Sequence, residues 1–64
     1  MNNIGEVLKL RGLKQKWLAE QLGLTPVMIS LYVSNKRQPK LQTLIRIAQL
    51  LDVEINDLIE LPNQ

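Results

Sequence analysis

The sequence predicts an all-α domain built from five short helices. Apolar residues recur at spacings of three and four along nearly the whole chain, which is typical of helices that each bury one face. Strand-like alternation of useful length does not appear, and glycine, proline and asparagine interrupt the pattern where helices would end. A chain of 64 residues has room for one small core. We therefore predict a single domain, residues 1–64, with helices at about 3–11, 15–22, 26–33, 41–51 and 55–60.

The first predicted helix follows Asn2 and Asn3, and either side chain can cap the free N–H groups at a helix start. Gly12 supplies a left-handed residue at its end. Its predicted inner face consists of Ile4, Val7 and Leu8.

The second and third helices are predicted to lie close together in sequence, on either side of Gly23. Leu18, Ala19 and Leu22 form the predicted inner face of the second helix. Thr25 followed by Pro26 is a strong start signal for the third, because a capping oxygen precedes a ring already set to helical φ. Asn35 is the predicted left-handed residue of the turn after it, and Pro39 lies in the loop that leads on.

The fourth helix has the clearest repeat, and Asp52 is predicted to close it. Its predicted inner face consists of Leu41, Leu44, Ile45, Ala48 and Leu51. The fifth helix is predicted to pack onto the rest through Val53, Ile55, Leu58 and Ile59, before a frayed tail over 61–64. Four apolar residues near the carboxyl end are open to two interpretations, core or self-association seam: Leu50, Leu58, Ile59 and Leu61.

Composition restricts the chemistry that we expect. The sequence has no Cys and no His, so disulfides, thiolate metal sites and the commonest general base are absent. We expect no enzyme activity, no catalytic or metal site and no cofactor. Trp17 and Tyr32 are too few for a base-stacking platform. The sequence shows neither a membrane span nor a signal peptide, so a cytoplasmic protein is the default expectation.

Charge is distributed unevenly along the chain. Residues 1–40 carry seven Lys or Arg against two Glu, a net charge of +5, whereas residues 41–64 carry one Arg against four acidic residues, a net charge of −3. This asymmetry suits a domain that turns one face toward a polyanion, although many domains with an ordinary solvated surface show it too.

Three residues at characteristic positions, Ala19, Gly23 and Ile29, predict a helix-turn-helix. This motif normally presents its second helix to the DNA major groove. Ala19 is small where two helices would cross, Gly23 permits the turn, and Ile29 is a branched apolar residue on the second helix. With its flanking residues, the chain from Ile4 to Ile59 resembles the phage-repressor-like (Cro/repressor, XRE) family of five-helix, lambda-repressor-like DNA-binding domains. The matching residues are Gly12, Leu13, Gln15, Leu18, Ala19, Leu22, Gly23, Thr25, Ile29, Ser30, Lys36, Arg37, Pro39, Leu44, Ala48, Leu51 and Leu58.

The resemblance implies contacts to the DNA backbone from two places. Gln15 matches a family glutamine that binds phosphate at the start of the second helix, where free N–H groups favour an anion. Lys36 and Arg37, flanked by Asn35 and Gln38, match a loop that makes further backbone contacts, and Asn35 is expected to bind DNA together with the two cations; an ordinary basic surface loop is the alternative. Base edges are expected to meet residues of the third helix, namely Pro26, Val27, Ser30 and Leu31, with Thr25 and Met28 beside them.

The sequence departs from the family pattern in ways that lead to further hypotheses. Lys14 and Lys40 stand where a capping residue is usual, and we expect both to bind phosphate, with tolerated surface lysines as the alternative. The third helix lacks the Arg, Asn and Gln that read bases bidentately, so we expect an A/T-leaning site read partly through DNA shape. Leu8 and Val33 replace an ion pair common in the family, and such a matched swap is compatible with the fold.

We therefore expect a sequence-specific double-stranded DNA-binding transcriptional regulator, most simply a repressor, that binds as a homodimer. The alternative is a protein-interaction or antitoxin-like module that kept the fold with weak base reading. Trp17, or the apolar residues near the carboxyl end, would contact such a protein partner; for Trp17 the alternative is packing against Leu10 or Leu13.

Overall fold

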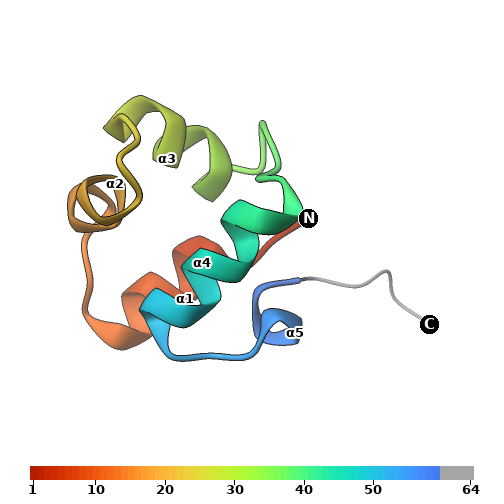
Figure 1. Ribbon diagram of the computed structural model, residues 1–64. Helices are drawn as coiled ribbons and strands as arrows, with labels where there is room; N and C mark the ends of the chain where they lie inside the picture. Colours follow the sequence, from red (N-terminus) through yellow and green to blue (C-terminus); the bar gives the residue numbers. More distant parts are fainter. Residues whose placement is uncertain (60–64) are drawn as a thin grey trace.

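A computed structural model describes residues 1–59, and over this range the chain forms five α-helices joined by short turns (Figure 1). The helices are α1 (Ile4–Arg11), α2 (Gln15–Leu22), α3 (Pro26–Val33), α4 (Leu41–Leu51) and α5 (Ile55–Leu58). The predicted all-α class is confirmed. In the described range the only strand-like pairing is an isolated antiparallel bridge between Asn2 and Ile59. The first helix starts one residue later than predicted, and the fifth ends at Leu58 because Ile59 is extended.

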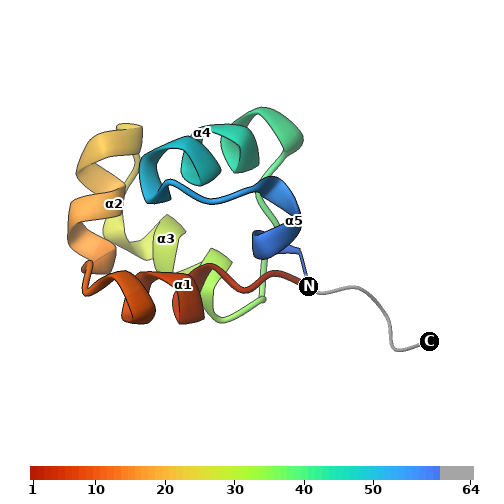
Figure 2. The ribbon, with the colours of Figure 1, turned by 90° about the horizontal axis from the view of Figure 1, so that it is seen from below.

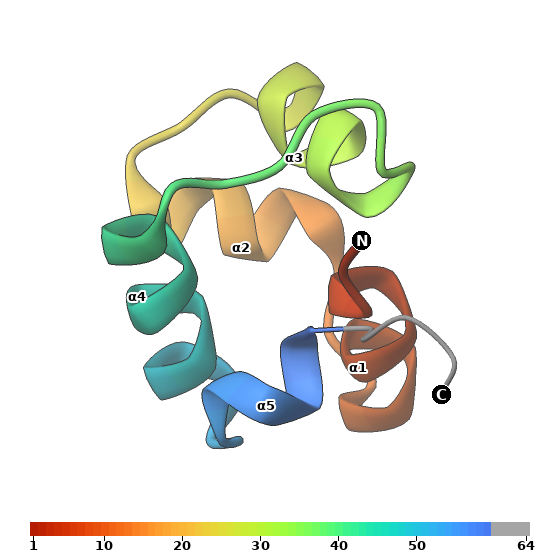
Figure 3. The same ribbon diagram turned by 90° about the vertical axis from the view of Figure 1, so that its right-hand side faces the viewer.

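Twelve apolar side chains form one core to which every helix contributes. The largest fully buried side chains of the core are those of Ile4, Leu18, Ile29, Ile47, Leu51 and Leu58. Val7, Leu8, Ala19, Tyr32, Leu44 and Ala48 complete it. α2 packs against α3 and α4, whereas α1 contacts both α3 and α4. α3 and α5 lie at opposite ends of the molecule, with α1 and α4 on its two sides (Figure 3).

The predicted inner faces of the helices are confirmed with one correction, which concerns α4. Leu41 was expected in the core but is 64% exposed, and Ile45 is only half-buried. Ile47, which the prediction omitted, is fully buried instead. The apolar stripe of α4 is therefore centred on Leu44, Ile47, Ala48 and Leu51, and its first residue lies beyond the edge of the core.

The predicted helix ends follow from residues that tolerate the left-handed conformation. Gly12 and Gly23 close α1 and α2 with φ of 68°, and Asp52 closes α4 with φ of 56°. Asn35 has φ of 63° in the loop after α3, as predicted. Each of these residues turns the chain near the end of a helix, so the helix boundaries are specified by local sequence.

The start of α1 shows which of the two candidate asparagines caps it. Asn3 occupies the N-cap position, but its side chain makes no capping bond. The Ile4 N–H instead donates to Asn2 Oδ1 at 3.0 Å. The Asn3 N–H donates to the carbonyl oxygen of Leu58 at 2.9 Å. The segment before α1 therefore lies against the end of α5 (Figure 2).

α1 and α3 approach closely at Gly5. A Cβ atom at this position would lie 2.7 Å from Val33 Cγ1, well inside van der Waals contact. Val33 is β-branched and has little freedom to move aside. Glycine is therefore required at position 5 for α1 to pack this closely against the end of α3.

Apolar residues near the carboxyl end mostly belong to the core. Leu58 is fully buried, and Leu50 and Ile59 are half-buried and pack against the core. Leu61 lies outside the described residues. No helix within residues 1–59 combines the length and apolar character needed to cross a membrane.

Candidate nucleic-acid interface

The outer face of α3 is open to solvent. Only Ile29 and Tyr32 of this helix are buried. The residues expected to meet base edges lie on the other side: Thr25, Pro26, Val27 and Ser30 are exposed, and Leu31 is half-exposed. Met28 is half-buried and packs against the core, which leaves it less surface for a ligand than its neighbours. α3 thus packs on the core through one face and presents the opposite face to solvent.

The start of α3 is fixed by its capping residue. Thr25 Oγ1 accepts a hydrogen bond from the Met28 N–H at 3.2 Å, and Pro26 occupies the first turn. This bond uses the hydroxyl oxygen as an acceptor and leaves its hydrogen for a further acceptor, such as a base edge or a phosphate. The Thr25 hydroxyl thus caps α3 and supplies a polar group at its start, next to the exposed apolar residues Pro26 and Val27.

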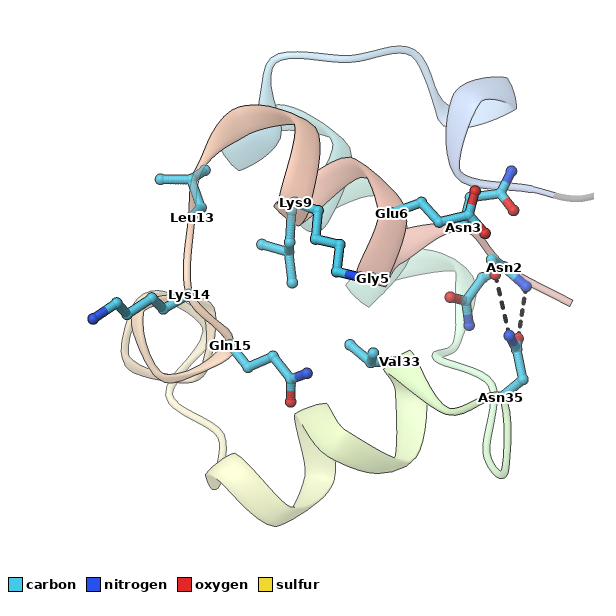
Figure 4. A pocket seen from close by; sticks show the side chains of 11 residues that line it. Asn2, Asn3, Gly5, Glu6, Lys9, Leu13, Lys14, Gln15, Val33 and Asn35 are labelled. Carbon is cyan, nitrogen blue, oxygen red and sulfur yellow. Dashed lines mark hydrogen bonds between the residues drawn. The ribbon is translucent and has the colours of Figure 1, made fainter.

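The start of α2 has no side-chain cap. Lys14 is the N-cap residue in an extended conformation, and its side chain makes no capping bond. Its ammonium points away from the molecule (Figure 4). Gln15 points into a pocket of about 470 Å³ bordered by α1, the start of α2 and the end of α3. The first N–H groups of α2 therefore have room for an acceptor from outside the chain.

The loop after α3 carries two exposed cations, Lys36 and Arg37. Their backbone N–H groups both donate to the carbonyl oxygen of Leu31, at 3.0 and 3.2 Å. This arrangement folds the loop back onto the last turn of α3. The side chains of the two residues remain exposed to solvent.

α4 begins in the same way as α2. Lys40 is its N-cap residue in an extended conformation with no side-chain capping bond, and it is exposed. The structure therefore confirms that both lysines occupy cap positions. Their binding to phosphate stays a prediction.

Comparison with known proteins assigns the arrangement to a family. A family model described as Helix-turn-helix matches residues 4–58, which is most of the chain. The chain belongs to the helix-turn-helix family. A crystal structure of a Bacteroides fragilis protein described as a candidate DNA-binding protein has 42% sequence identity to it and a TM-score of 0.93. That likeness covers 94% of this chain and 97% of the other. No curated protein matched the sequence.

In this helix-turn-helix domain the motif comprises α2, the turn at Gly23 and Leu24, and α3. The Leu24 N–H donates to the carbonyl oxygen of Ala19 at 3.0 Å, which ties the turn to the end of α2. Ala19 is 1% exposed, and Ile29 is fully buried. The three positions that predicted the motif therefore serve the packing and the turn expected of them.

Leu8 and Val33, the matched departures from the family pattern, line the same pocket between α1 and α3. Leu8 is only 2% exposed, and Val33 is half-buried. Leu8 extends the core of this helix-turn-helix domain at the place where the family resemblance implies a charge.

Trp17 is half-buried and packs against the core. It lines a surface hollow together with Leu13, whereas Leu10 is 85% exposed. This placement favours Leu13 over Leu10 as the neighbour of Trp17. A role of Trp17 in contacting a protein partner stays a prediction.

We expect Lys14→Ser and Lys40→Ser each to stabilise the free domain by about 1 kcal/mol. Serine can accept a hydrogen bond from the uncapped N–H groups, and the substitution removes a cation from the positive end of a helix dipole. Each variant should also bind duplex DNA more weakly, by a similar factor for every sequence. Urea unfolding and DNA titration check the two effects; unchanged affinity in both variants would contradict a phosphate-binding role.

Proposed function

We propose that this protein is a sequence-specific double-stranded DNA-binding transcriptional regulator that acts as a repressor, with α3 in the major groove. The observation that carries the proposal is the exposed outer face of α3, in a chain that also exposes cations at the starts of α2 and α4 and in the loop after α3. A helix that packs on the core through one face can enter the major groove with the other, while the cations bind phosphates on either side.

The proposed contacts divide into two groups. Lys14, Gln15, Lys36, Arg37 and Lys40 would bind phosphate and supply most of the affinity. Base edges would meet the exposed residues of α3 and its cap, namely Thr25, Pro26, Val27, Ser30 and Leu31. Val27 is 69% exposed, so its methyl groups are available to thymine methyl groups. We therefore propose an A/T-leaning site, bound by a homodimer whose two copies of α3 lie one DNA turn apart.

A titration of duplex DNA over a salt series tests this function. Affinity should fall linearly on a log–log plot, with a slope of about −0.9 for each phosphate contacted. Arg11→Gln is a control for cations outside the proposed interface. The Arg11 guanidinium donates to the Asp52 carbonyl oxygen at 3.0 Å, at the end of α4 and away from α3. Removing that cation should leave the slope unchanged.

Selection of ligands from random duplexes tests base reading separately. A/T-rich half-sites should be enriched; enrichment of G-rich half-sites would contradict the proposed contacts of α3. Absence of duplex binding at every salt concentration would instead favour the protein-interaction or antitoxin-like alternative, for which the exposed apolar Val27 is the best structural argument.

A further inference from the structure

The segment before α1 is joined to the loop after α3 by a network of side-chain amides. Asn2 is only 6% exposed, the one polar residue in the described chain that is buried. Asn35 and Gln38 reach it from the loop, across more than thirty positions of sequence. Asn35 directly precedes Lys36, and Gln38 directly follows Arg37, so the network holds the loop on both sides of the two cations in sequence.

The main chain of Asn2 pairs with the side chain of Asn35 in both directions. The Asn2 N–H donates to Asn35 Oδ1 at 2.8 Å, and Asn35 Nδ2 donates to the Asn2 carbonyl oxygen at 3.2 Å (Figure 4). The Asn35 side-chain amide therefore bonds to the Asn2 main chain in the way that the backbone of a neighbouring strand would. This reciprocal pair fixes the position of Asn35, whose φ of 63° sets the direction of the loop.

The side chain of Asn2 has every hydrogen-bonding group engaged. Nδ2 donates to the Tyr32 carbonyl oxygen and to Gln38 Oε1, each at 2.9 Å, and Oδ1 caps α1 through the Ile4 N–H. Gln38 Nε2 in turn donates to Asn35 Oδ1 at 3.1 Å. A buried polar network in which each member is satisfied rigidifies what it holds. Here it joins the last turn of α3, the start of α1 and both ends of the cationic loop.

We propose that Asn2 is a positioning residue for DNA binding, and that it holds the 35–38 loop so that Lys36 and Arg37 reach the phosphate backbone. This inference rests on the proposed function, because it assigns a role to Asn2 only if the loop meets DNA. Asn2 itself lies beneath the loop and contacts no DNA. Because Asn2 already orders the loop in the free protein, less conformational entropy is lost when Lys36 and Arg37 bind phosphate.

The test compares three neutral substitutions, so that no variant gains a charge that would repel DNA. Asn2→Ser keeps an oxygen that can cap Ile4 but removes both Nδ2 donors. Asn35→Gly keeps the left-handed backbone while deleting the paired amide. Asn3→Ser is the matched control: within residues 1–59 the Asn3 side-chain amide donates only to the Asp57 carbonyl oxygen, at 3.5 Å, on the side facing α5. Each variant is assayed well below its unfolding midpoint, with helicity monitored by circular dichroism.

We expect Asn2→Ser and Asn35→Gly to weaken duplex binding on the order of tenfold. The magnitude of the salt slope should decrease by about 1 to 2, toward the value for the Lys36→Ala/Arg37→Ala double variant. Asn3→Ser should match the wild type. Adding Asn2→Ser to the Lys36→Ala/Arg37→Ala variant should cause no further loss, because the cations that Asn2 positions are already absent. General loss of folded protein would not produce a change in slope or this lack of additivity.

The outcomes separate this inference from the proposed function. A wild type that does not bind duplex DNA overturns both. If the wild type binds and the Lys36→Ala/Arg37→Ala variant loses slope, but Asn2→Ser and Asn35→Gly keep it, only the positioning role is overturned. An additive loss in the triple variant, or an unchanged slope in the Lys36→Ala/Arg37→Ala variant, overturns the positioning role as well.

Discussion

Val27→Glu is expected to lower affinity for duplex DNA by about 100-fold or more while leaving the free energy of unfolding nearly unchanged. Val27 is 69% exposed near the start of α3, so the substitution removes little buried surface. In the major groove, however, a carboxylate would lie between two phosphate backbones, and a like-charge approach of this kind costs several kcal/mol. Fluorescence anisotropy with a labelled duplex measures the affinity, and urea unfolding measures the stability.

Leu10→Glu is the matched control for this prediction. It makes the same change in net charge at another exposed apolar residue, 85% exposed on α1. Its effect on affinity should be small and should disappear at higher salt, since it acts only through long-range repulsion. Equal losses in both variants would show that net charge explains the effect, and would remove the reason for placing α3 in the groove.

Leu8→Arg is expected to destabilise the domain by more than about 2 kcal/mol, because it places a charge at a position that is only 2% exposed. In a domain of 64 residues a loss of this size is a large part of the total stability. Thermal and urea unfolding should both report it. A loss below about 1 kcal/mol would mean that the guanidinium escapes to water through the adjoining pocket.

Adding Val33→Glu should recover part of that loss. Positions 8 and 33 line one pocket of about 470 Å³, which gives the two charged side chains space to meet. Restoring both members of an ion pair removes the penalty of the unpaired charge, and a double-mutant cycle isolates the coupling between them. Strictly additive losses would show that the two side chains do not interact.

Local signals predicted most of the fold. Gly12, Gly23 and Asn35 adopt the left-handed conformations expected from their residue types, and the Thr25–Pro26 pair starts α3 as predicted. These features depend on neighbours within a few residues, so sequence reasoning can reach them. The error at α4 has a different origin. A spacing of three and four admits Leu41 as well as Ile47, and only the tertiary arrangement decides where the core ends.

The candidate site was predictable in part. The family resemblance indicated α3 and the cations near it, and the structure finds the outer face of α3 uncovered and Lys14, Lys36, Arg37 and Lys40 on the surface. The sequence predicts Asn2 only as a candidate helix cap and gives no sign of the network around it. Its partners Asn35 and Gln38 are distant in sequence, and no local pattern links an asparagine before the first helix to a loop after the third.

The pairing of the segment before α1 with the end of α5 has a consequence for how the domain forms during synthesis. Asn2 and Asn3 leave the ribosome before any of the five helices, whereas their partners Leu58 and Ile59 emerge after four of those helices have been made. Closing so long a stretch of chain costs entropy that only the finished core repays. α1, α2 and α3 share their core with α4 and α5, so the domain is complete only after the last turn of α5 has cleared the exit tunnel.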